Sequence, residues 1–168
     1  MKSFAEKVQI VPLRAPAVST DSFNAAAVKM KNVQWLAFYV QWGAMAGAAT
    51  ATYTFKPRSS TGNASATAAG DTALPFQYRL ASAVGADSWG AITSVAADTG
   101  VAVTEAQANR ALLIEVDPAA IPGLDSDAQY CYLECIAAGD GATDSNYAMD
   151  VTALIAPRYP QNANLGTT

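Results

Sequence analysis

Residues 33–55, VQWLAFYVQWGAMAGAATATYTF, contain no charged side chain. An uncharged run of this length suits two kinds of structure. One is a helix that spans a lipid bilayer, which needs about 20 apolar residues. The other is a pair of strands buried inside a β fold. The segment therefore decides the general class of the protein.

Some features of the segment fit a membrane helix, because basic residues flank it and residues 43–47, GAMAG, have GxxxG spacing. Two observations favour strands instead. Gln34 and Gln41 would each need a polar partner inside the hydrocarbon. Residues 49–55 alternate threonine with alanine or an aromatic residue, which is the two-residue period of a strand. The segment therefore predicts two strands joined at residues 43–47, and we expect no membrane association.

Short alternating segments between turn signals continue along the rest of the chain. Residues 7–14 predict a strand near a sheet edge, because Pro12 lacks the amide hydrogen that a central strand uses. One helical turn, capped by Asp21, fits residues 23–30. Residues 56–72 are polar and aperiodic, and predict a long exposed loop. Further strands are predicted at residues 73–82, 88–95, 101–104, 110–118, 128–138 and 147–160.

This order of elements predicts an all-β fold, a jelly-roll-like β-sandwich of about eight strands with at most one short helix. We expect an extended arm over residues 1–20, the sandwich over residues 21–160 and a flexible tail over residues 161–168. The N-terminus lacks the apolar run of a signal peptide, so we expect the chain to be made and kept in a cytoplasm.

The composition argues against several functional classes. The chain has no histidine, which removes the commonest general base and the commonest zinc ligand. Its net charge of −4 does not suit a nucleic-acid partner, which requires a basic surface. No phosphate-binding loop or nucleophile motif is present. We therefore expect no enzymatic activity, no cofactor and no nucleic-acid partner.

The cysteines and the paired acids have simple interpretations. On a strand, Cys131 and Cys135 would lie about 13 Å apart, too far for a disulfide, so we expect buried, reduced thiols. The acid pairs of two loops fit hydrogen-bonded turns best, and a calcium site at one loop stays open. These pairs are Asp125 with Asp127 and Asp140 with Asp144.

Beyond residue 45 the segments follow an order that carries a family resemblance. The matching positions are Phe55, Leu74–Arg79, Asp87–Trp89, Leu113–Asp117 and Pro157–Tyr159. Together they resemble a group of small tailed-bacteriophage proteins, the head decoration or cement proteins. The resemblance covers about two thirds of the chain and none of the first forty residues. It implies a β-sandwich, often a trimer, that is made in the bacterial cytoplasm and binds the major capsid protein on the outside of the virion.

Two functions are therefore considered. The first is a virion structural protein that decorates the capsid. The alternative is a receptor- or carbohydrate-binding module of a phage fibre or spike. In that module aromatic side chains would stack on sugar rings, although packing in the core or an interface is the simpler role for them. The aromatic residues concerned are Trp35, Trp42, Trp89, Tyr78, Tyr130 and Tyr132.

Contact residues are expected near the two chain ends and in residues 33–42. Free chain ends can add strands to a neighbouring sheet. Residues 33–42 are apolar on both faces of the predicted strand, which fits burial by the core on one side and by a partner on the other. The expected contact residues are Val8, Ile10, Arg14, Trp35, Phe38, Trp42, Arg158 and Tyr159.

Overall fold

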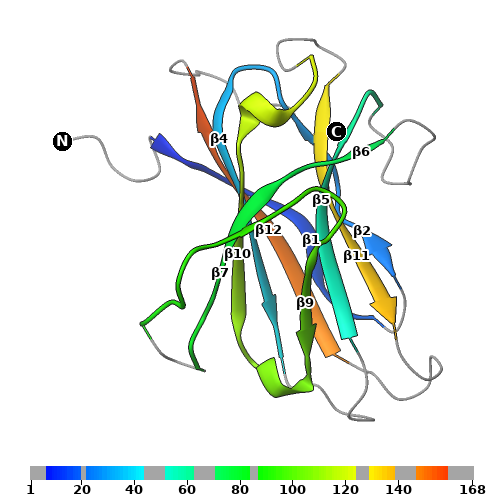
Figure 1. Cartoon of the computed structure of the whole chain (residues 1–168), viewed down its shortest axis with the longest axis vertical. Coiled ribbons are helices and arrows are strands. Elements are labelled where there is room, and N and C mark those ends of the chain that lie inside the picture. The colour runs from blue at the N-terminus through cyan, green and yellow to red at the C-terminus, as the bar shows by residue number, and fades with distance from the viewer. Residues whose placement is uncertain are drawn as a thin grey trace.

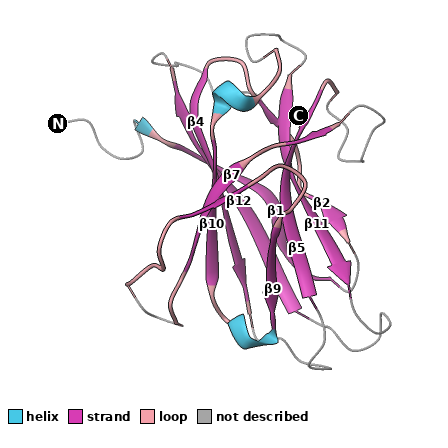
Figure 2. Ribbon diagram, in the orientation of Figure 1, coloured by secondary structure: helices cyan, strands magenta, loops and turns pink. Residues whose placement is uncertain are grey.

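Two antiparallel sheets pack against each other in a computed structural model of the chain (Figures 1 and 2). The model describes residues 7–19, 22–43, 52–62, 71–83, 87–123, 129–138 and 147–158. The first sheet has the order β1 (Gln9–Ser19), β12 (Tyr147–Pro157), β4 (Val33–Trp42), β10 (Ala111–Val116), β7 (Phe76–Leu80) and β8 (Thr93–Val95).

The second sheet is built around β11 (Tyr130–Ala138) and β5 (Thr52–Ser60), which pair with each other. The edge of β11 that does not pair with β5 pairs with β2 (Phe23–Asn24) and β3 (Val28–Lys29). The edge of β5 that does not pair with β11 pairs with β6 (Thr72–Ala73) and β9 (Val101–Thr104). Two single 3-10 turns, η1 (Glu105–Gln107) and η2 (Pro118–Ala120), lie between described strands.

The strand pairing is that of one long hairpin rolled into two sheets. β1 pairs with β12, β2 and β3 pair with β11, β4 pairs with β10, and β5 pairs with β9. Within each arm of this hairpin, successive strands lie in alternate sheets. A rolled antiparallel hairpin of this kind is a jelly roll. The prediction of an all-β, jelly-roll-like sandwich is therefore confirmed.

Three strands lie outside this hairpin pairing. β6, β7 and β8 fall between β5 and β9 in the chain, at the turn of the rolled hairpin. β7 pairs with β10, and β8 pairs with β7, so both extend the first sheet beyond the roll. The predicted loop over residues 56–72 is wrong at both ends, because residues 56–60 pair with β11 and Thr72 pairs with β5.

The helical turn predicted within residues 23–30 is wrong. This segment forms β2 and β3, which pair with β11 at four positions. Between them, the Ala25 amide donates to the Leu133 carbonyl at 2.9 Å, and the Met30 amide donates to the Gln129 carbonyl at 2.9 Å. Backbone pairing with β11 therefore overrides the helix propensity of the alanine run.

The core lies between the two sheets and is centred on β4. Leu36, Phe38, Val40 and Trp42 alternate along this strand, and all four belong to the core cluster. They pack with side chains from the second sheet, among them Tyr53, Phe55, Cys131, Leu133 and Cys135. The first part of the uncharged segment is thus a central strand, as predicted, and residues 44–51 lie outside the described residues. No helix in the described part of the chain is long and apolar enough to cross a membrane.

β1 forms one edge of the first sheet, which agrees with the edge strand predicted from Pro12. Residues 9–19 of the predicted N-terminal arm are therefore part of the sheet. The pairing of β1 with β12 is irregular between Pro12 and Ala17, where its register shifts twice. Prolines and bulges at an edge make it a poor template for a further strand. The predicted tail at residues 161–168 lies outside the described residues.

Cys131 and Cys135 are buried free thiols, as predicted. Their side chains point into the core from β11, where they pack as small apolar groups. Burial raises the pKa of each thiol well above its ordinary value of 9.0, because the apolar surroundings disfavour the thiolate.

Gly100 lies in the turn between β8 and β9, where the backbone passes close to β5. Its φ is 75°, and an added Cβ would lie 2.6 Å from the Thr54 Cγ2 atom and 3.0 Å from the Phe55 carbonyl oxygen. We expect Gly100→Ala to lower the free energy of unfolding by about 2–4 kcal/mol, from backbone strain and crowding together. Urea unfolding followed by circular dichroism measures the loss.

Gly123→Ala is the matched control for this substitution. Gly123 has a similar φ of 67°, but among the described residues its added Cβ would meet nothing closer than the Gln129 Oε1 atom at 3.7 Å. The control should therefore cost about 1 kcal/mol, from backbone strain alone. Equal losses in the two variants would contradict the close packing at Gly100.

The buried thiols predict a loss of stability in alkali. The native state keeps both thiols protonated, whereas the unfolded chain releases their protons above pH 9.0. The stabilisation is therefore complete below that pH, and each thiol removes up to about 1.4 kcal/mol per pH unit above it. Urea unfolding at a series of pH values tests this. The Cys131→Ala/Cys135→Ala variant should be less stable at neutral pH but less sensitive to alkali, and an equal sensitivity would contradict the assignment.

Candidate functional site

The two sheets present very different outer faces, where the outer face of a sheet is the side away from the core. Outward positions of the second sheet carry mainly polar and charged side chains. The polar and charged ones are Thr52, Thr54, Lys56 and Arg58 on β5, Thr104 on β9 and Glu134 on β11, and the apolar ones include Ala102, Ile136 and Ala138. A face of this composition is suited to contact with water.

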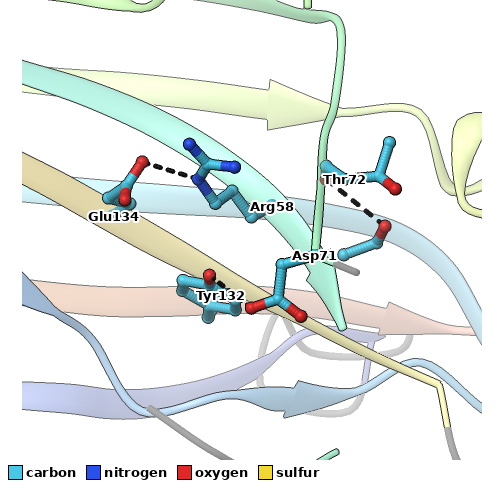
Figure 3. A network of polar contacts seen from close by, with 6 residues as sticks. Arg58, Asp71, Thr72, Tyr132 and Glu134 are labelled. Carbon is cyan, nitrogen blue, oxygen red and sulfur yellow. Dashed lines mark hydrogen bonds and ion pairs between the residues drawn. The ribbon is translucent and has the colours of Figure 1, made fainter. Parts of the chain in front are cut away.

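A network of polar contacts ties this outer face together (Figure 3). The Arg58 Nε group donates to the Glu134 Oε2 atom at 2.6 Å. The Tyr132 hydroxyl donates to the Asp71 Oδ2 atom at 2.8 Å, so the segment before β6 is attached to β11. Arg58, Glu134, Tyr132 and Asp71 therefore have hydrogen-bond partners within the protein.

The pKa values in this network follow from its burial and its charges. Burial raises the pKa of Tyr132, and the hydrogen bond to Asp71 raises it further. Burial alone would lower the pKa of Arg58, but the hydrogen bond and charge of Glu134 outweigh it and the pKa is raised. Both side chains therefore stay protonated, which suits a structural role better than proton transfer.

The outer face of the first sheet is mainly apolar over the half that contains β1, β12 and β4. A row of cross-strand partners runs over all six strands of this sheet. In order, it contains Ile10, Leu154, Ala37, Glu115, Gln77 and Ser94. The neighbouring outward positions add Tyr39, Leu113 and Ala156, and the polar side chains of Thr152, Gln41 and Asp150 lie on the same side of the sheet. We call Ile10, Tyr39, Leu113, Leu154 and Ala156 the apolar face; each is partly or fully exposed, and Ile10 is 58% exposed.

Four of the predicted contact residues come together at one end of the first sheet, and one of them, Ile10, belongs to the apolar face. Gln9 pairs with Ile155, and Ala156 pairs with Trp35, so the start of β1, the end of β12 and the start of β4 lie at one end of the first sheet. Val8, Ile10, Trp35 and Arg158 therefore lie at this end. The Arg158 amide also donates to the Asn32 carbonyl at 2.7 Å. Tyr159 lies outside the described residues.

Phe38 and Trp42, which were expected to contact a partner, are buried in the protein. Both point into the core, with exposed fractions of 0% and 2%. The Trp42 indole also donates from Nε1 to the Gln107 carbonyl at 2.8 Å. Because the second sheet covers these side chains, they are not presented to a partner. The outward apolar residue between them on β4 is Tyr39.

Arg14 has a role within the fold. Its guanidinium lies over the Phe23 ring, with 3.7 Å between the Cζ atom and the ring centroid. The contact joins β1 of the first sheet to β2 of the second. The Nε group of Arg14 is buried and has no hydrogen-bond partner among the described residues. The cation–π contact with Phe23 therefore stabilises the buried guanidinium.

An open groove of about 480 Å³ lies next to Trp35, where β4, β7, β8 and β10 meet η2. Its polar lining is formed by Gln34, Gln77, Ser94, Glu115 and Asp117, its aromatic lining by Trp35 and Phe76, and its other lining residues are Pro75, Val95, Val116, Pro118 and Ala120. Sequence reasoning identified Trp35 but missed the five polar residues as members of one site. Their alternation shows which of them point outward, but the strand order that brings them together cannot be seen in the sequence.

The other aromatic residues that the sequence offers for sugar stacking do not line the groove with Trp35. Trp42 is in the core, Tyr132 is buried on the second sheet, and Trp89 is exposed beside its bridge partner Ala81. The described residues contain no group of three or more Cys, Asp or Glu side chains arranged to hold a metal ion. The two loops with paired acids, at residues 125–127 and 140–144, lie outside the described residues.

No protein-family model, curated protein or solved structure matches this chain. The resemblance to head decoration proteins therefore stays a prediction from the sequence.

The opposite placement of Phe38 and Tyr39 predicts opposite sensitivities to truncation. Phe38→Ala removes a fully buried side chain and should lower the free energy of unfolding by about 3–5 kcal/mol. Tyr39→Ala removes a partly exposed side chain and should cost about 1 kcal/mol. Thermal and urea unfolding of both variants measure the difference. A larger loss for Tyr39→Ala would contradict the assignment of the faces.

Proposed function

We propose that this protein is a bacteriophage virion structural protein, a capsid decoration or cement protein that binds the outside of the head and stabilises the shell. The observation that carries the proposal is the apolar face of the first sheet. It lies on the opposite side of the sandwich from the polar, hydrogen-bonded face of the second sheet. The resemblance read from the sequence supports the same function.

Binding of a partner to the apolar face is favourable because it removes apolar surface from water. Burial of apolar surface contributes about 25 cal/mol per Å². Ile10, Leu154 and Tyr39 lie on three adjacent strands, so one flat partner surface can cover all three. A partner that covers this face also explains why β4 is apolar on both sides. Enrichment in aromatic and aliphatic side chains without charge is typical of the central part of an interface.

The contact uses a sheet face rather than a sheet edge. Residues 9–19 are already paired with β12, and their outer edge carries Pro12, Pro16 and two register shifts. An added strand would find few regular hydrogen-bonding positions there. Removal of residues 1–16 would also strip most of an edge strand from the sheet. Substitution on the apolar face is therefore a cleaner test of capsid binding than truncation.

Decoration stabilises a shell by mass action. A protein that binds the mature shell and not its dissociated subunits adds RT ln(1 + [L]/Kd) of stabilisation at each site. Symmetric shells repeat that site many times, and a trimeric decoration protein gains further avidity from its linked contacts. We expect the partner to be the major capsid protein, the protein to be a homotrimer, and its place to be the virion surface.

The alternative function is a receptor- or carbohydrate-binding module of a phage fibre or spike. The groove beside Trp35 favours it, because aromatic and hydrogen-bonding side chains meet there. The number of copies in the particle separates the two functions. A decoration protein is present in amounts comparable with the capsid subunit, whereas a fibre or spike protein is present in few copies.

The proposed function predicts that one charge on the apolar face abolishes capsid binding. Purified protein is mixed with empty heads assembled from the major capsid protein of the same virus, and the heads are then sedimented. We expect the wild type to sediment with the heads and to raise their melting temperature. Leu154→Asp should bind at least about tenfold more weakly, because it buries an unpaired carboxylate in the contact.

The matched control places the same charge on the other sheet. Ala102→Asp lies at an exposed position of β9 and should bind heads as the wild type does. Circular dichroism checks that both variants remain folded. A wild-type protein that fails to bind heads would refute the proposed function, and equal binding by Leu154→Asp would refute the role of the apolar face.

A further inference from the structure

The groove beside Trp35 has the composition of a ligand site, because apolar residues that include Phe76 and Val116 of the core line it together with polar side chains. It is formed where the β6–β8 segment, which lies outside the hairpin pairing, extends the first sheet next to β10. Its volume of about 480 Å³ is within the range of about 300–1,000 Å³ that small-molecule sites occupy. It therefore has room for a small organic ligand.

The strand register places three polar side chains in a line along the groove. Glu115 pairs with Gln77, and Gln77 pairs with Ser94, so the three lie side by side on adjacent strands. Adjacent strands are about 4.8 Å apart, which spreads these groups over about 10 Å. Neighbouring hydroxyl groups of a sugar are spread over a similar length. The row therefore offers hydrogen bonds along the whole edge of such a ligand.

Trp35 stands at one end of this polar row. Glu115 pairs with Ala37, and Trp35 is two residues from Ala37 on the same face of β4. This diagonal relation places the two Cβ atoms about 7–8 Å apart, within reach of an aromatic side chain. The indole and the carboxylate thus line the same groove, one with an apolar surface and the other with hydrogen-bond acceptors.

An irregularity in β4 adds Gln34 to the same side. Neighbouring residues of a regular strand point to opposite faces, yet Gln34 and Trp35 both line the groove. The pairing of β4 with β12 shifts here, since Ala156 pairs with Trp35 but Pro157 pairs with Val33. Such a bulge redirects one side chain. Gln34 therefore joins the groove because of the bulge.

The polar groups of the groove have hydrogen-bonding capacity to spare. The side chains of Gln34, Gln77 and Glu115 make no hydrogen bond or ion pair within the described part of the chain. Asp117 is partly committed, because its Oδ1 atom accepts from the Ala119 amide at 2.9 Å and caps η2. The groove thus contains one side chain held in place by a hydrogen bond, that of Asp117, and three side chains that are available to a ligand.

The charge and chemistry of the lining select the class of ligand. The lining contains Glu115 and Asp117 but no lysine or arginine among the described residues, so it disfavours anionic ligands. The amides of Gln34 and Gln77 both donate and accept, as sugar hydroxyl groups do. A quaternary ammonium ion would suit Trp35 and Glu115 but would leave the amide donors unmatched.

We propose that this groove binds one or two pyranose rings of a neutral saccharide, with Trp35 stacked on the C–H face of a ring and Gln34, Gln77 and Glu115 bonded to its hydroxyl groups. This site lies beside the apolar face and is distinct from it. It goes beyond the proposed capsid contact and is compatible with either of the two functions above.

Titration with neutral disaccharides tests the proposal. The full chain is titrated with maltose, lactose, cellobiose and N,N′-diacetylchitobiose, with choline as the cationic comparison, by saturation-transfer NMR and tryptophan fluorescence. We expect saturable binding of at least one disaccharide with a dissociation constant of about 1 mM or below. Absence of saturable binding by all four disaccharides would overturn the proposal, as would binding of choline in their place.

Two variants locate the site. Trp35→Ala should weaken binding by about tenfold or more, because it removes the stacking surface. Gln77→Ala, at an exposed position, should weaken it several-fold without disturbing the fold. Trp89→Ala, which removes an exposed tryptophan outside the groove, should bind as the wild type does.

The same proteins separate this proposal from the capsid contact. Leu154→Asp should lose head binding and keep saccharide binding, since Leu154 does not line the groove. Equal saccharide affinities for Trp35→Ala, Gln77→Ala and the wild type would overturn the site even if a sugar binds elsewhere. Circular dichroism of each variant shows whether a loss of binding is a loss of fold.

Discussion

Packing of one face of β4 against the second sheet is the interaction on which the rest of the structure depends. Leu36, Phe38 and Val40 are fully buried there, and the same strand pairs with β12 on one side and β10 on the other. Those two neighbours carry β1 and β7, so the first sheet grows outward from β4. Because the inward face of β4 is used by the core, its outward residues are left for the surface, and three of them, Trp35, Ala37 and Tyr39, are apolar or aromatic as well.

The contrast between the two outer faces follows from this arrangement. On the second sheet, Arg58 with Glu134 and Tyr132 with Asp71 satisfy each other, so that face gains little from a partner. On the first sheet, the central outward residue Tyr39 pairs with Leu113 and Thr152, and Leu154 lies diagonally beside it. Exposed apolar surface that is concentrated on one face is the usual mark of an interaction site. The apolar face is thus where binding gains most.

Local periodicity predicted the fold class, but the positions of the site depended on pairing. The strands predicted at residues 110–118 and 128–138 are present in the structure as β10 and β11. β2 and β3 were missed because their two-residue pairings depend on β11, which is remote in the chain. The polar, aperiodic composition of residues 56–72 predicts a loop where β5 ends, and the strand tolerates Pro57 because this residue lies between the last pair with β9 and the first with β6. Phe38 was assigned outward because a strand that is apolar on both sides carries no sign of which face is the core.

The β6–β8 segment gives the molecule a second surface that the roll alone would lack. The long hairpin closes through the pairs β4 with β10 and β5 with β9, neither of which involves this segment. By adding β7 and β8 beside β10, the segment extends the polar row from Glu115 to Gln77 and Ser94. It also moves the sheet edge from β10 to the three-residue strand β8, which is too short to be an effective template for another strand. Both edges of the first sheet are therefore protected, and recognition is left to its outer face: to the apolar face near β1 and β12, and to the groove where the added strands meet β4 and β10.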